Sequence, residues 1–176
     1  AAVAAGKIGS IPSVSGPNLV GDGVTLAAGT GIEGLKLAVN TIEHASTGAG
    51  AISLTEVDGA AEQRQGLVIE KIETTSGSVT IGAQDTIEVH SVRAGGGSST
   101  AQLTSASGSV QVAPAAGGAG SAAIVAGSDV VLDGPQGITL RGGLSAPDVL
   151  EFHLDGTFLI SGIPLDFTAN TVIIEE

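Results

Sequence analysis

The 176-residue sequence contains no cysteine, methionine, tryptophan or tyrosine, and its only aromatic residues are three phenylalanines. Without cysteine the chain forms no disulfide and offers no thiolate ligand to a metal. Its core must therefore be built from alanine, valine, isoleucine and leucine, and such small and branched side chains favour a thin, regular interior over a bulky one.

Basic residues are also scarce, because six Lys and Arg stand against eighteen Asp and Glu and give a net charge of -12. This charge repels nucleic-acid backbones and anionic membrane surfaces. No apolar stretch reaches the roughly 18 residues that a spanning helix needs. We expect no nucleic-acid partner and no membrane insertion. Since the chain begins with neither methionine nor a signal sequence, we expect a processed product or part of a longer protein.

The stretch AAGTGIEG, residues 27–34, matches the dinucleotide-binding pattern at Gly29, Gly31 and Gly34. Apolar residues between 35 and 42 follow at helical spacing and indicate a short helix that ends at His44. After His44, however, the chain is a succession of short β-type runs between Gly-Ser, Asp-Gly and Gly-Gly turns. A nucleotide fold needs helices on both faces of its sheet, so we interpret the three glycines as turn residues.

Related segments recur along this all-β chain: SGSVTI at 76–81, SGSVQV at 107–112, GSDVVL at 127–132 and QGITL at 136–140. A unit of turn and short strand predicts a parallel β-helix, or β-solenoid, of about eight coils with roughly 20 to 25 residues each. The inward positions should stack as aliphatic ladders. These positions are Val79 and Ile81, Ile87 and Val89, Val110 and Val112, and Val130 and Leu132.

The alternative architecture is an antiparallel β-sandwich, and its best support is VLEFHLDGTFLISG at 149–162. Alternating apolar residues flank Asp155-Gly156, which is typical of a type I′ turn, so we predict an antiparallel hairpin here. The expected organisation is an N-terminal extension or connecting strand at 1–19, solenoid repeats at 20–143, and a C-terminal hairpin and terminal strand at 144–176.

The segments GDGVTLAAGTGIEG, TTSGSVTIGAQDTIEVHSVRAGG and LTSASGSVQV carry a resemblance to a known family. They resemble the repeat region of very large bacterial exoproteins of the filamentous-haemagglutinin-like type, with units reading G-x-[VI]-T-L-x-A-x-x-G-I and G-[SDN]-[VI]-x-[VIL]. The resemblance covers roughly residues 20–143. It implies a right-handed parallel β-helix in a secreted or cell-surface adhesin or fibre.

Acidic residues at turns are the candidates for metal binding. Calcium prefers oxygen ligands, and a row of such turns would gather carboxylates, but Asp-Gly is also simply a favoured turn dipeptide and the calcium-binding nonapeptide repeat is absent. We favour turn chemistry and expect no other cofactor. The calcium candidates are Asp22, Asp58, Asp129, Asp133 and Asp155.

Enzymatic activity is not expected. The histidines His44, His90 and His153 are isolated and lack metal-ligand spacing, and we expect His90 and His153 to face solvent from strands. A carbohydrate-active enzyme or polysaccharide-binding module is the alternative, but the chain has no Trp or Tyr to stack on sugars. The one mixed-charge patch for it comprises Asp58, Glu62, Arg64, Glu70, Lys71 and Glu73.

Both ends of the sequence are apolar. An isolated solenoid needs a polar capping coil, and uncapped strands invite strand addition. We therefore expect a structural or adhesive module, extracellular or at the cell surface, that joins end to end with copies of itself or with tandem neighbours. A surface glycan or cell-surface receptor is the further expected partner. The assembly candidates are Ile8, Ile11, Val172, Ile173 and Ile174.

Overall fold

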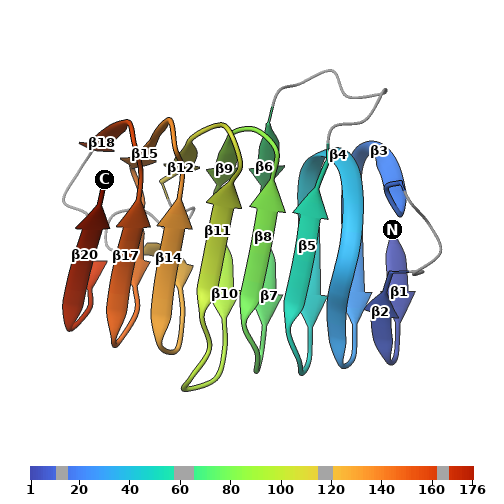
Figure 1. Ribbon diagram of the computed structural model, residues 1–176. Helices are drawn as coiled ribbons and strands as arrows, with labels where there is room; N and C mark the ends of the chain where they lie inside the picture. Colours follow the sequence, from blue (N-terminus) through green and yellow to red (C-terminus); the bar gives the residue numbers. More distant parts are fainter. Residues whose placement is uncertain (11–15, 58–65, 115–120, 162–166) are drawn as a thin grey trace.

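The computed structural model describes residues 1–10, 16–57, 66–114, 121–161 and 167–176. Within these ranges every regular element is a β-strand, and there is no helix. All strand pairs are parallel and stack as a β-solenoid of about seven turns, with the two chain ends at opposite ends of the stack (Figure 1). The predicted parallel β-helix is confirmed, and the antiparallel sandwich is wrong.

The coils present three faces, each a parallel sheet. The first face consists of β5 (Ile52–Glu56), β8 (Val79–Ala83), β11 (Ala101–Ser105), β14 (Asp129–Asp133), β17 (Val149–His153) and β20 (Thr171–Glu175). The second consists of β6 (Leu67–Ile69), β9 (Ile87–Val89), β12 (Val110–Val112), β15 (Gly137–Leu140) and β18 (Thr157–Ile160). The third consists of β7 (Ile72–Thr74), β10 (Val92–Ala94), β13 (Ala122–Val125), β16 (Gly143–Ser145) and β19 (Phe167–Thr168).

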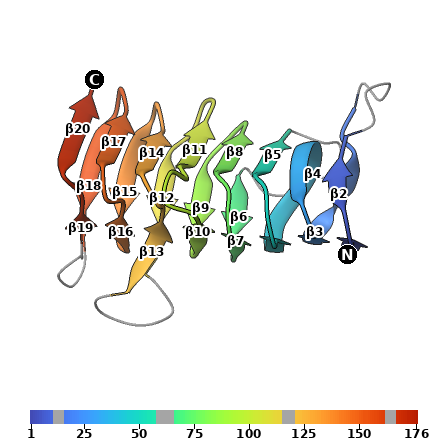
Figure 2. The same ribbon diagram turned by 90° about the horizontal axis from the view of Figure 1, so that it is seen from below.

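The N-terminal coils have longer strands. The 17-residue β4 (Gly31–Thr47) passes along all three faces, because it pairs in turn with β5, β6 and β7. On its other side it pairs with β3 (Leu19–Ala28) and β2 (Lys7–Gly9), and β3 in turn pairs with β1 (Ala2–Ala4). Figure 2 shows the same succession of coils from below.

The core is a set of apolar ladders, as predicted. Val79, Ile81, Val110 and Val130 are fully buried, and each packs in register with an inward residue of the neighbouring coil. Coil length is less regular than expected. On the first face, the sequence separation between paired inward residues of neighbouring coils ranges from 20 residues (Ile32 to Ile52) to 29 residues (Ala101 to Val130).

The short helix predicted to end at His44 is wrong, because residues 35–44 belong to β4. Gly31 and Gly34 adopt positive φ angles of 143° and 66°, and Gly34 lies where the register with β5 shifts. Gly29 sits at the bend between β3 and β4, where an added Cβ would overlap the carbonyl oxygen of Ala5. These glycines thus allow the chain to change direction sharply and the coils to stack closely.

The antiparallel hairpin at 149–162 is also wrong. Strand β17 pairs in parallel with β14 and β20, while β18 pairs in parallel with β15 on the next face. Asp155 and Gly156 form a corner between faces, and neither has the positive φ that a type I′ turn requires. The solenoid therefore continues through β16, β17, β18, β19 and β20 with the same strand direction.

Candidate functional site

Three polar side chains line up across the last three strands of the first face. Asp133 on β14 is in register with His153 on β17, and His153 is in register with Glu175 on β20. Their neighbours Leu132 and Phe152 are buried in the core. Because side chains alternate along a strand, the three polar residues point outward from the solenoid.

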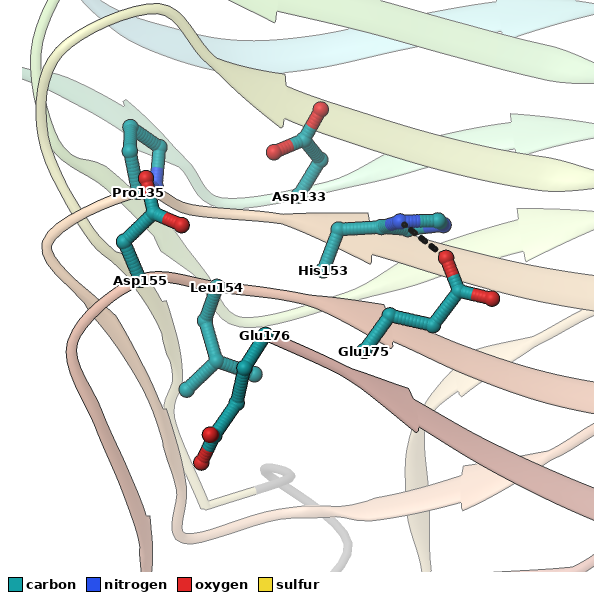
Figure 3. Close-up of a pocket in the computed structure, with 7 residues that line it drawn as sticks. All are labelled: Asp133, Pro135, His153, Leu154, Asp155, Glu175 and Glu176. Carbon is teal, nitrogen blue, oxygen red and sulfur yellow. Dashed lines mark ion pairs between the residues drawn. The ribbon is translucent and has the colours of Figure 1, made fainter.

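His153 lies between two carboxylates. Its Nε2 is 3.0 Å from Oε1 of Glu151, two residues earlier on the same strand, and its Nδ1 is 3.4 Å from Oε2 of Glu175. The side chains of Glu151, His153 and Glu175 are 31%, 36% and 60% exposed. We call these three residues the acid–histidine cluster. Figure 3 shows the carboxylate of Glu175 directed at the imidazole ring.

An open depression of about 210 Å³ surrounds the imidazole. Asp133, Asp155, Glu175 and Glu176 line it together with His153, Pro135 and Leu154 (Figure 3). No lysine or arginine is among these lining residues of the described chain. Repulsion between the carboxylates is therefore not offset by a neighbouring basic side chain, and the depression favours a cation over an anion.

Two of the five predicted calcium candidates, Asp133 and Asp155, meet in this depression. Asp22 lies on β3, where it accepts a hydrogen bond from Nδ2 of Asn40 at 2.7 Å. Asp129 begins β14 and accepts from Ser128 Oγ at 2.9 Å, which supports a role in that turn. Asp58 lies outside the described residues. Of the four candidates that the structure describes, only Asp133 and Asp155 line the same depression.

The prediction that His153 is an isolated residue is wrong, because its partners come from the same strand and from the next coil. The local signal was Glu151-Phe152-His153, in which two outward residues alternate around an inward one. The distant signal was Glu175, one coil later in the same register. His90 has a similar partner in Glu88, whose Oε1 lies 3.2 Å from its Nε2.

The mixed-charge patch considered for sugar cleavage contains ion pairs among those of its residues that the structure describes. Nζ of Lys71 lies 2.9 Å from Oε2 of Glu73, and Nε2 of His44 lies 3.2 Å from its Oε1. The hydrogen bond from Lys71, aided by that from His44, lowers the pKa of Glu73. A general acid needs a raised pKa, so Glu73 is not suited to that role. Asp58, Glu62 and Arg64 lie outside the described residues, and Glu70 follows β6.

We expect Lys71→Met to raise the pKa of Glu73 towards its ordinary value of 4.5, because the substitution removes the strongest partner of the ionised carboxylate. A lowered pKa in the folded state adds stability above the ordinary value, and this contribution is lost as pH falls through the lowered value. Carboxyl-detected NMR titration of Glu73 measures the shift. The matched Lys36→Met should leave the titration unchanged, and an unchanged curve in Lys71→Met would contradict the assignment.

The C-terminal end of the core is uncovered. Val172 and Ile174 on β20 occupy the same inward positions as Leu150 and Phe152, but they are 57% and 52% exposed, whereas Leu150 and Phe152 are 1% and 2% exposed. The same contrast holds on the other faces for Ile160 and Phe167. Ile173, the third predicted assembly residue of this strand, is in register with Glu151 and points outward.

The N-terminal end carries an apolar hollow. Ala2, Ile8, Leu19 and Leu35 line it, and its volume is about 230 Å³. Ile8 lies on β2 and is half-buried against the core. Ile11, the other predicted assembly residue of this end, lies outside the described residues. Both ends of the stack thus carry apolar surface, a hollow at the N-terminal end and exposed apolar residues at the C-terminal end.

No protein-family model, curated protein or solved structure matches this chain. The part of the chain described by the structure has no helix long and apolar enough to cross a membrane.

Proposed function

We propose that this chain is a structural and adhesive module of a secreted or cell-surface exoprotein or fibre, and that its copies associate end to end. The observation that carries the proposal is the uncovered C-terminal coil. Val172 and Ile174 occupy inward-facing core positions, yet each residue is more than half exposed. Apolar surface of this kind marks an interaction site.

The strand edges support the same association. Within the described residues, β18, β19 and β20 pair on one side only, with β15, β16 and β17. At the opposite end β1 and β2 also pair on one side only. Unpaired edges present backbone donors and acceptors that a parallel strand of another chain can satisfy.

Shape and charge both fit a contact between opposite ends. The N-terminal hollow has room for apolar side chains such as those of Val172 and Ile174. Residues 1–16 carry one lysine and no acidic residue, whereas residues 155–176 carry four acidic and no basic residues. Contacts between two different ends do not close on themselves, so repeated contacts build a filament.

The test compares association of the full chain with that of two variants. Sedimentation velocity over a rising concentration range, with negative-stain electron microscopy, should show growing end-to-end assemblies of the wild type. Val172→Lys/Ile174→Lys places two charges on the uncovered core and should leave monomers. The control Ile173→Lys changes an outward residue of the same strand and should assemble like the wild type.

A wild-type chain that stays monomeric throughout the concentration range would contradict the proposal. Equal assembly of the double variant would place the contact away from this end. A glycan array with the wild-type chain tests the adhesive part separately, since sugar binding requires no assembly.

A further inference from the structure

We propose that Glu151, His153 and Glu175 form a binding site for a divalent first-row transition-metal ion such as zinc, and that the bound ion fixes the terminal strand β20 to β17. One nitrogen or oxygen from each residue lies within 4.8 Å of the other two. This is the one such group of three among the residues that the structure describes.

The backbone already holds the ligands in place. Glu151 and His153 are two residues apart on β17, so both point outward from one strand. Glu175 is in register with His153 on the neighbouring strand. At zinc bonds of about 2.0–2.2 Å, ligand atoms of a tetrahedral site lie roughly 3.5 Å apart. Glu151 Oε1 lies beside Nε2 of His153 and Glu175 Oε2 beside Nδ1, so one of these partly exposed glutamate side chains would have to rotate for both to meet an ion at a single imidazole nitrogen.

The donor set selects the class of ion. Calcium and magnesium take oxygen ligands, whereas an imidazole nitrogen suits zinc and its neighbours in the first transition row. Two carboxylates and one imidazole leave a fourth position for water. Asp133, on the other side of His153 in the same ladder, adds negative charge near the site. The proposal differs in both ion and residues from a calcium site built on Asp-Gly turns.

The site joins two coils. Glu175 belongs to β20, which in the described chain has a strand partner on one side only, and the other two ligands belong to β17. A bound ion therefore adds a link between the last coil and the one before it. Ligands that bind only the folded arrangement stabilise that arrangement. Local opening of β20 should become rarer when the ion is bound.

In the experiment, zinc chloride is titrated into the full chain at neutral pH, and calorimetry measures the heat of binding at each step. We expect one zinc ion per chain, and affinity at least about tenfold weaker in His153→Gln and in Glu175→Gln, because each removes one of three ligands. The matched control is His90→Gln, since His90 has a glutamate partner but belongs to no group of three among the described residues. It should bind zinc like the wild type.

Hydrogen exchange provides a second readout that does not depend on the affinity values. Zinc should slow amide exchange in residues 171–175 of the wild type and leave it unchanged in Glu175→Gln. Circular dichroism checks that each variant folds, and we expect Glu175 to tolerate the amide because its side chain is 60% exposed. Neither measurement requires association of the ends.

Three results would overturn the proposal or part of it. Wild-type zinc affinity in both His153→Gln and Glu175→Gln would place any bound zinc elsewhere. Calcium binding that is as tight as zinc binding and independent of His153 would show an oxygen-only site. Strong zinc binding with no change in the exchange of residues 171–175 would overturn the link between the ion and β20.

Discussion

Leu103→Ala should lower the free energy of unfolding by about 3 kcal/mol, within the 2–5 kcal/mol range for emptied core positions. Leu103 is fully buried on β11 and is in register with Ile81 of the preceding coil and Leu132 of the following one. With backbone ladders on both sides, the neighbouring coils cannot close the space left by the missing atoms. The cost should therefore include the cavity as well as the lost burial.

Far-UV circular dichroism during chemical denaturation is the measurement, because the chain has no tryptophan or tyrosine to report by fluorescence. The matched control is Gln102→Ala, an exposed position next to Leu103 on the same strand. It should change stability by no more than about 0.5 kcal/mol. Similar losses in the two variants would contradict the alternation of core and surface on β11.

The stacked rows of buried aliphatic residues were predictable because most strands after β4 alternate between inward and outward residues. In β8 and β11, small or polar residues separate the inward residues, and turn residues bound each run. This pattern gives the strand, its buried face and its length without knowledge of the partner strand. Stacking such units buries a continuous core, which is why the parallel solenoid followed from the repeats.

The false helix has a specific physical cause. β4 turns corners between faces, and at one of these corners Leu37, Ala38, Val39 and Asn40 are all buried in succession. A strand that changes face interrupts its two-residue alternation. The resulting spacing of buried residues imitates a helical period over one or two turns. Only the partners of β4 on all three faces distinguish the two structures.

The antiparallel hairpin was wrongly predicted for a different reason, because strand pairing is not determined by local sequence. The residues around Asp155-Gly156 do form two strands with a tight connection, and the alternation of Phe152 and Leu154 on the core side is present. Local sequence specifies a turn, but the choice between folding back and continuing around a coil depends on which strands are already stacked. The same nonlocal information positions Glu175 beside His153.

Gly127→Ala should lower the free energy of unfolding by about 3 kcal/mol, at the upper end of the usual cost of overpacking. Gly127 lies at a corner before β14 and does not have a positive φ, so alanine suits its backbone conformation. A Cβ there, however, would overlap the carbonyl oxygen of Gly96 in the preceding coil and approach Oγ of Ser99 to 2.9 Å. Relief requires the two coils to separate.

Ser99 makes that separation costly. Its Oγ donates to the carbonyl oxygen of Ala94 and accepts from the backbone N–H of Gly127 at 3.0 Å, and its side chain is buried. Moving the corner at Gly127 would break this bridge between coils and leave a buried polar group with fewer partners. The loss should therefore appear as reduced protection of the Gly127 amide in hydrogen exchange, together with a lower denaturation midpoint.

Gly97→Ala is the matched control, because it lies in the same corner region but a Cβ there would meet nothing within 4 Å. Its φ is not positive, so alanine should be neutral or stabilise the fold by up to about 1 kcal/mol through the unfolded state. A large loss in Gly127→Ala with none in Gly97→Ala would mean that corner glycines are required by the distance between coils. Equal stability of the two alanine variants would mean that the coils can separate at this corner at little cost. The distance between coils would then not require glycine at position 127.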